Sequence, residues 1–155
     1  MTPSSTTTAA DRLRRSVLAL LAGSLALPTA ACGSAPPEEP EQVRLAERYF
    51  EDNNLAARRG PQAQEEFFRR TQHPDFQDQT CQLGTATVDL QPAMSTLRPD
   101  PDYSPSGVGP PRGAAWVIGV EVTTRRDGAI IGRQIGSQHL VLLDGQIHGF
   151  APCPS

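Results

Sequence analysis

The sequence predicts an α+β domain in which two N-terminal helices pack on a curved, four-stranded antiparallel sheet. Residues 41–59 place apolar side chains at the 3.6-residue period of a helix. From residue 81 onward the period changes to two, which is typical of strands. Asp-Gly pairs at 127–128 and 144–145 separate alternating apolar segments and are strong hairpin signals. Helices followed by hairpins indicate the α+β class.

Two short helices account for residues 41–71. Gly60-Pro61 predicts the end of one helix, at residue 59, and the start of the next, which runs to residue 71. Asn53 falls in the middle of the apolar half of the first helix. Either this helix bends at Asn53, or a polar group faces the interior. The apolar half comprises Val43, Leu45, Ala46, Tyr49, Phe50, Ala56 and Ala57.

Four strands are expected after the helices. Their ranges are 81–90, 114–126, 129–143 and 146–151. Residues 91–113 contain six prolines and three glycines and predict a long irregular loop. Gly132 and Gly136 are expected points of bending or bulging in the longest strand.

The two-residue turns predict which strand residues face each other. Continued without a bulge, the pairing sets Trp116 opposite His139 and Val141 opposite His148. The more apolar face would then meet the helices and carry Trp116, His139 and His148 together. This arrangement suggests a ligand pocket, and the alternative is that both histidines simply pack at the margin of the core. A single bulge would turn part of this face over.

The N-terminus has the features of an export signal. Arg12, Arg14 and Arg15 precede an uncharged apolar stretch at 16–27, which is shorter than the about 20 residues needed to span a bilayer. Small residues follow this stretch. We therefore interpret residues 1–31 as a signal peptide.

Thr29-Ala30-Ala31-Cys32 resembles the lipobox of bacterial lipoproteins, in which a Cys directly follows small residues. The family pattern usually has Leu at the position of Thr29. The resemblance implies cleavage before Cys32, diacylglycerol on its thiol, and anchoring at the extracytoplasmic face of the cell membrane. An ordinary signal peptide cut near Ala31 is the alternative. Residues 14–18 also look like a twin-arginine export motif, so the export route stays open. Residues 32–40, with three prolines, would form a flexible linker before a single domain at 41–155.

Two cysteines remain after the lipidated one. An even number in an exported chain suggests a disulfide, here between Cys81 and Cys153. Closing so long a loop would stabilise the domain by about 4 kcal/mol in the chain-entropy model. A redox-active or metal-bound pair is the alternative, although neither Cys has a partner at the usual spacing for such a site.

Composition and motifs limit the functions to consider. The chain has 155 residues and a net charge of −3, which argues against nucleic-acid binding. No catalytic, cofactor or metal motif is apparent. The order of elements resembles the cystatin-like or nuclear-transport-factor-2-like architecture, which implies helices on the concave side of a bent sheet.

We therefore expect a non-catalytic, membrane-anchored lipoprotein. It would bind a protein partner in the envelope or a small apolar ligand. The alternatives are an isomerase or cyclase that uses His139 or His148 in a concave pocket, and a structural envelope protein.

Overall fold

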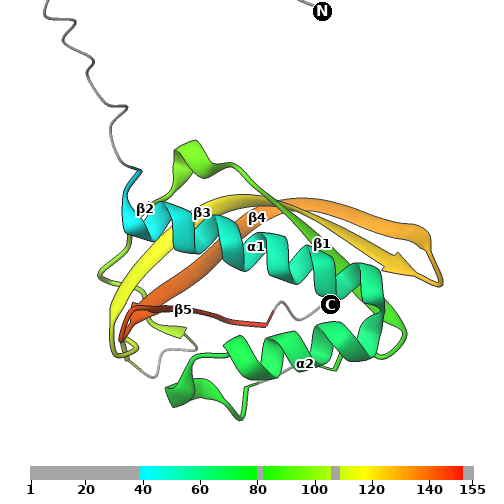
Figure 1. Cartoon of the computed structure of the whole chain (residues 1–155), viewed down its shortest axis with the longest axis horizontal. Coiled ribbons are helices and arrows are strands. Elements are labelled where there is room, and N and C mark those ends of the chain that lie inside the picture. Colours follow the sequence, from blue (N-terminus) through cyan, green and yellow to red (C-terminus); the bar gives the residue numbers. More distant parts are fainter. Residues whose placement is uncertain (1–38, 80–81, 106–108, 152–155) are drawn as a thin grey trace, which may run out of the picture. The chain divides into compact units, whose positions relative to one another are not determined.

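The structure is a computed structural model, and it describes residues 39–79, 82–105 and 109–151. The predicted signal peptide, Cys32, Cys81 and Cys153 lie outside these residues, as does most of the linker. Within them, the fold is α+β, with two helices that precede an antiparallel sheet (Figure 1). No helix in this part of the chain is long and apolar enough to cross a membrane.

Both helices have the bounds that the sequence predicts. Helix α1 spans Glu41–Arg59 and α2 spans Pro61–Thr71. Gly60 joins them with a φ of +112°, a conformation that glycine tolerates best, and Pro61 begins α2. Helix α1 continues through Asn53, whose side chain is buried, so the polar group faces the interior.

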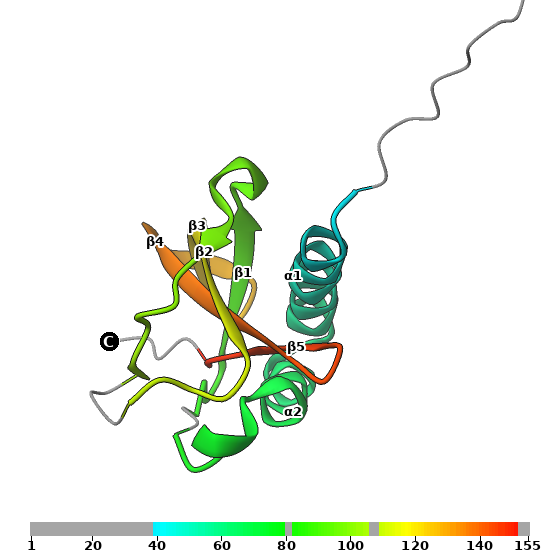
Figure 2. The ribbon, with the colours of Figure 1, turned by 90° about the vertical axis from the view of Figure 1, so that its left-hand side faces the viewer.

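The sheet has the order β1-β3-β4-β5, with a short β2 also paired to β3. The helices lie on one side of it (Figure 2). The strands are β1 (Ala86–Pro92), β2 (Arg98–Pro99), β3 (Ala114–Arg126), β4 (Ala129–Leu143) and β5 (Gln146–Gly149). The ranges predicted for β3 and β4 are confirmed.

Three sequence-based boundaries need correction. Strand β1 spans Ala86–Pro92 rather than 81–90. It begins later because Gly84 sits in a turn with a φ of +61°, and it ends later because Gln91 and Pro92 still pair with β3. Strand β5 ends at Gly149 rather than at 151, because the chain then bends toward α2, where the Ala151 N–H donates to Gln72 Oε1 at 3.0 Å.

The third correction concerns residues 91–113, which are not irregular throughout. β2 pairs with β3, and a 3-10 turn spans Met94–Thr96. Ala93 N–H donates to the Gly119 carbonyl at 2.9 Å. Gly119 N–H in turn donates to Thr96 Oγ1 at 2.8 Å. This segment therefore continues the hydrogen bonding along the edge of β3.

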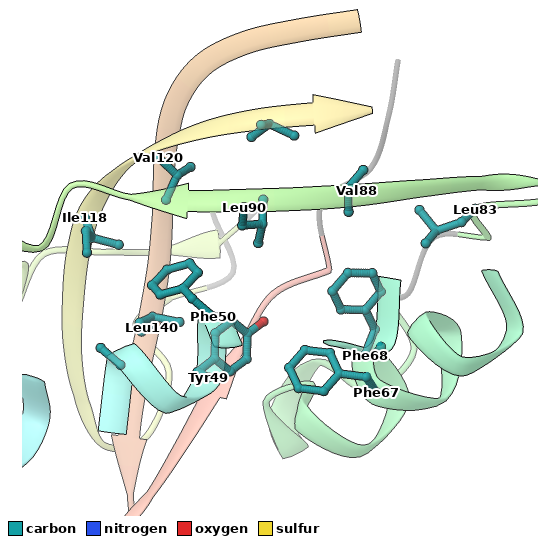
Figure 3. Close-up of a cluster of buried hydrophobic side chains, with 13 residues drawn as sticks. Tyr49, Phe50, Phe67, Phe68, Leu83, Val88, Leu90, Ile118, Val120 and Leu140 are labelled. Atoms are coloured by element: carbon teal, nitrogen blue, oxygen red, sulfur yellow. The ribbon is translucent and has the colours of Figure 1, made fainter. Parts of the chain in front are cut away.

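The core fills the space between the helices and the sheet. Figure 3 shows aromatic rings from both helices directed toward the strands. Phe50, Ile118 and Leu140 have 1%, 0% and 1% of their surface exposed. Tyr49 packs against Phe67 with ring centroids 5.2 Å apart. Burial of the Tyr49 hydroxyl raises its pKa, an effect that a side-chain hydrogen bond with Thr71 opposes.

Side-chain amides from the helices close the outer edge of β1. Gln64 Nε2 donates to the Val88 carbonyl at 2.7 Å, and Val88 N–H donates to Gln64 Oε1 at 2.9 Å. Asn54 makes the same pair of bonds with Leu90, each of 2.8 Å. Gln64 also donates to Asn53 Oδ1 at 2.8 Å. These amides form hydrogen bonds with backbone groups that an edge strand would otherwise leave without partners.

Candidate functional site

A β-bulge separates the residues predicted to share a pocket. Arg125 pairs with Ile130, but Thr124 pairs with Gly132, so Ile131 is an extra residue in β4. Beyond this point the pairing is shifted by one residue from the predicted register. Because side chains alternate between faces, a one-residue shift turns the remainder of β4 over relative to β3.

The prediction that Trp116 shares a face with His139 is wrong for this reason. Trp116 pairs with Leu140, a residue of the core next to the helices. His139 pairs with Val117, on the opposite side of the sheet, which we call the outer face. His148 pairs with Val141, as predicted, so it lies on the outer face too.

A carboxylate that could not be identified from the sequence pattern holds His139. Its Nε2 lies 2.9 Å from Asp100 Oδ2. The Tyr103 ring stacks on the imidazole with centroids 3.7 Å apart and an angle of 6°. Burial, and then the nearby charge of Asp100, raise the pKa of Tyr103. Asp100 and Tyr103 both come from the segment predicted to be an irregular loop.

A second histidine pair lies beside this contact. The rings of His73 and His148 are 5.7 Å apart. His73 is fully buried, its Nδ1 accepts from Asp75 N–H at 3.2 Å, and its Nε2 lies 2.9 Å from the Arg112 carbonyl. These partners fit the neutral ring that carries its proton on Nε2. Burial is the main cause that lowers the pKa of His148.

An exposed ion pair completes the attachment of the loop to the domain. Arg112 Nη2 lies 2.6 Å from Asp75 Oδ1. The hydrogen bond from Arg112 lowers the pKa of the Asp75 carboxyl. Together with the bonds to His139 and His73, this pair ties the segment after β2 to the outer face. Within the ranges that the structure describes, no three His, Cys, Asp or Glu side chains gather as metal ligands would.

Depressions on the described surface include one beside Trp116 and one at the β3–β4 hairpin. One of about 230 Å³ is bordered by Trp116 and by prolines that include Pro99 and Pro111. Another of about 460 Å³ lies at the end of the β3–β4 hairpin, next to Ile131 and Arg133. Neither His139 nor His148 lines either of these two depressions. Two buried nitrogens, Trp116 Nε1 and His148 Nδ1, have no hydrogen-bond partner among the described residues.

The outer edge of β4 is the most exposed apolar feature of the sheet. β5 covers this edge only from Leu140 to Leu143. Within the described residues, no strand pairs with the edge before Leu140. Ile130, Ile131 and Ile135 are 44%, 51% and 87% exposed. Large, β-branched, apolar residues on an open strand edge favour pairing with another chain.

The hydrogen bonds of β1 show which backbone groups of β3 point toward β1 and which point toward β4. Backbone groups of successive strand residues point to opposite neighbours. Because Val88 and Leu90 bond to the amides of the helices, Asp89 must direct its backbone groups to its β3 partner, Thr123. Thr123 therefore faces β1, and the residues on either side of it face β4.

The same alternation continues into β4. Val122 and Thr124 face β4 and pair with Gln134 and Gly132, which consequently face β3. The residues between and beyond them direct their N–H and C=O groups outward, away from β3. These outward residues are Arg133, Ile135 and Ser137.

Comparison of the chain with protein-family models, with curated proteins and with solved structures gives no match. The candidate site therefore depends on the geometry of this chain alone.

Proposed function

We propose that this chain is a lipid-anchored extracytoplasmic protein whose α+β domain binds a protein partner at the open edge of β4, without catalysis. The observation that carries the proposal is the contrast between the two edges of one sheet. The side-chain amides of Gln64 and Asn54 close the β1 edge, whereas Ile135 at the β4 edge is 87% exposed. A partner strand would gain main-chain hydrogen bonds there and would cover the isoleucines.

A protein partner fits the structure better than a small apolar ligand does. A ligand pocket between the sheet and the helices needs space that side chains do not fill. Phe50, Phe67 and Leu90, which face each other across this layer, are 1%, 2% and 0% exposed. The resemblance to cystatin-like architecture therefore enters the proposal as a scaffold, with the helices packed against one face of a curled sheet, and not as a ligand chamber.

The contacts of the histidines favour a structural role rather than an enzymatic one. They hold the segment after β2 against the sheet. An isomerase or cyclase needs an acid or base that reaches substrate in a pocket. His139 is paired with Asp100 and covered by Tyr103. His148 packs against His73, and burial lowers its pKa. These contacts support the binding function.

The anchor is the part of the proposal that places the domain at a membrane. Cys32 follows the small residues typical of a lipobox, and the α1 helix begins at Glu41. The short segment between them would tether the domain close to the bilayer. Two or three acyl chains would hold it there stably, because each buried methylene adds about 0.8 kcal/mol.

Replacement of Cys32 by Ser tests the anchor. We expect the unchanged chain to fractionate with membranes and to begin at Cys32, with the mass of diacylglycerol on that residue. Cys32→Ser should lack the lipid and the cleavage before residue 32, whereas Ser34→Ala, two residues away, should retain both. Mass spectrometry of the purified N-terminal peptide measures these outcomes. An unmodified Cys32 thiol in the unchanged chain would contradict the anchor.

A further inference from the structure

A depression adjoins the open β4 edge on the helix-facing side of the sheet, which we call the inner face. In Figure 1 the β3–β4 hairpin reaches past the end of α1. Side chains alternate along a strand, so Gly132 and Gln134 share the inner face with Leu140 of the core. Both line the depression of about 460 Å³ at the hairpin end, together with the buried residues Leu83 and Ala86. The depression is therefore continuous with the edge at which we propose a partner strand.

The charged side chains of this depression are all positive. Arg126 and Arg133 line it, and none of the described residues that line it is acidic. Neither arginine forms an ion pair within the described ranges, whereas the neighbouring Arg125 is paired with Asp89. Polar, uncharged side chains complete the lining: Gln82, Thr124 and Gln134. Guanidinium and amide N–H groups are donors that bind carboxylates. The depression is therefore complementary to an acidic group.

Gly132 leaves an open path from the strand edge to this depression. Its φ is not in the left-handed region, so its conformation admits any residue type. A Cβ atom at this position would meet nothing within 4 Å. A glycine inside a strand often marks a place where a ligand or another backbone approaches closely. A side chain of a partner strand next to Gly132 can therefore cross β4 toward Arg126.

We infer that the partner strand carries an acidic side chain next to Gly132 on the inner face, with its carboxylate at Arg126. The inference rests on the proposed function and gives the chemistry of its partner. Ile135 is three residues from Gly132, so its side chain lies on the outer face. The partner should therefore carry an apolar residue beside Ile135, three positions from the acidic residue. The order of the two depends on whether the strand runs parallel or antiparallel to β4.

The preference for an acidic residue has to come from this local site. The chain as a whole has a net charge of −3, so it does not attract acidic segments in general. An interaction between exposed charges weakens as the salt concentration rises. We therefore expect a preference for Glu over Gln at one position of the partner, and we expect salt to reduce it.

Titration of the full chain in nonionic detergent with short peptides tests the inference. The first peptide is Thr-Thr-Val-Thr-Thr-Glu-Thr-Thr with blocked ends, and a second has Gln in place of Glu. A third and a fourth have the reversed order, for the other strand direction. Amide chemical shifts of the isotope-labelled chain give the affinities and the residues affected. In one of the two orders, the Glu peptide should shift residues 132–135 and bind about fivefold more tightly than the Gln peptide.

Three variants locate the carboxylate. Arg126→Gln should abolish the preference for Glu, because it removes the charge. Gly132→Thr should weaken binding of the Glu peptide, because it places a side chain in the path, although threonine suits a strand. Arg48→Gln, the same change at an exposed arginine of α1, should leave the preference intact. None of the three should lower the thermal midpoint, since both arginines are exposed and the space at residue 132 is open.

Three results would overturn the inference: no binding of the Glu peptides at millimolar concentration, equal binding of the Glu and Gln peptides in both orders, or a preference for Glu that Arg126→Gln leaves unchanged. The proposed function is tested separately, by protection of the Ile135 amide in native membranes. If that protection is found without the preference for Glu, the edge binds a partner of different chemistry, and the proposed function stands.

Discussion

Replacement of Gln64 by Ala is expected to lower the free energy of unfolding by about 4 kcal/mol. Gln64 is fully buried and serves both backbone groups of Val88, together with the amide oxygen of Asn53. Alanine would leave the Val88 N–H and Asn53 Oδ1 without a partner among the described residues, whereas the Val88 carbonyl would keep its bond from Asn53 Nδ2 at 3.2 Å. Each buried polar group without a partner costs about 1–3 kcal/mol, and the space that the side chain vacates adds to the loss.

Gln62 provides the matched control, because it is the same residue type in the same helix but is exposed. Gln62→Ala should change the free energy of unfolding by less than about 0.5 kcal/mol. Urea unfolding followed by circular dichroism measures both variants. Equal effects of the two substitutions would show that Gln64 does not close the edge of β1 in the way described.

Replacement of Gly149 by Ala should lower the free energy of unfolding by about 3 kcal/mol. A Cβ atom at Gly149 would lie 2.0 Å from the Tyr49 hydroxyl oxygen and 2.5 Å from Tyr49 Cζ. Tyr49 has little room to move, because its ring packs between Phe50 and Phe67 with centroids 5.5 Å and 5.2 Å away. Thermal unfolding should show the loss as a lower midpoint.

Gly136, in the same sheet, provides the control for the effect of a Gly→Ala change on the backbone alone. A Cβ atom at Gly136 would meet nothing within 4 Å, so Gly136→Ala should be close to neutral. Removal of the nearest clashing atom by Tyr49→Phe should reduce, but not abolish, the cost of Gly149→Ala. If Gly149→Ala costs no more than Gly136→Ala, the close approach of β5 to α1 is not as described.

The helices could be predicted because local signals determine them. Gly60-Pro61 marks their junction, and the apolar period of 41–59 marks the buried side of α1. The two interpretations of Asn53 could not be separated from the sequence. Its amide bonds to the carbonyl of Val88, which is 35 residues away and lies in a strand of uncertain start.

The register of β4 shows where sequence reasoning fails. The Asp-Gly turns predict the ends of the hairpins correctly, and the pairing of Arg126 with Ala129 follows from them. The bulge at Ile131 adds one residue within an apolar run, and no change of pattern marks it. Gly132, an expected bulge point, lies directly after it, but a glycine does not specify which residue is extra. This one residue separates Trp116 from His139.

The partners of the histidines depend on contacts between distant segments. Asp100 is 39 residues from His139, and Arg112 is 39 residues from His73. Prolines around Asp100 suggested an irregular loop, and nothing in their spacing indicated which residue of the loop would reach the sheet. The predicted disulfide between Cys81 and Cys153 and the lipid on Cys32 stay predictions, since all three residues lie outside the described ranges.

Hydrogen exchange at single amides of β4 tests the central claim, binding at this edge, most directly. The amides of Arg133, Ile135 and Ser137 should exchange quickly in the dilute purified chain. In native membranes they should exchange on the order of tenfold more slowly. Gly132 and Gln134, which bond to β3, should be protected in both states. Equally fast exchange of the three outward amides in both states would contradict binding at the β4 edge.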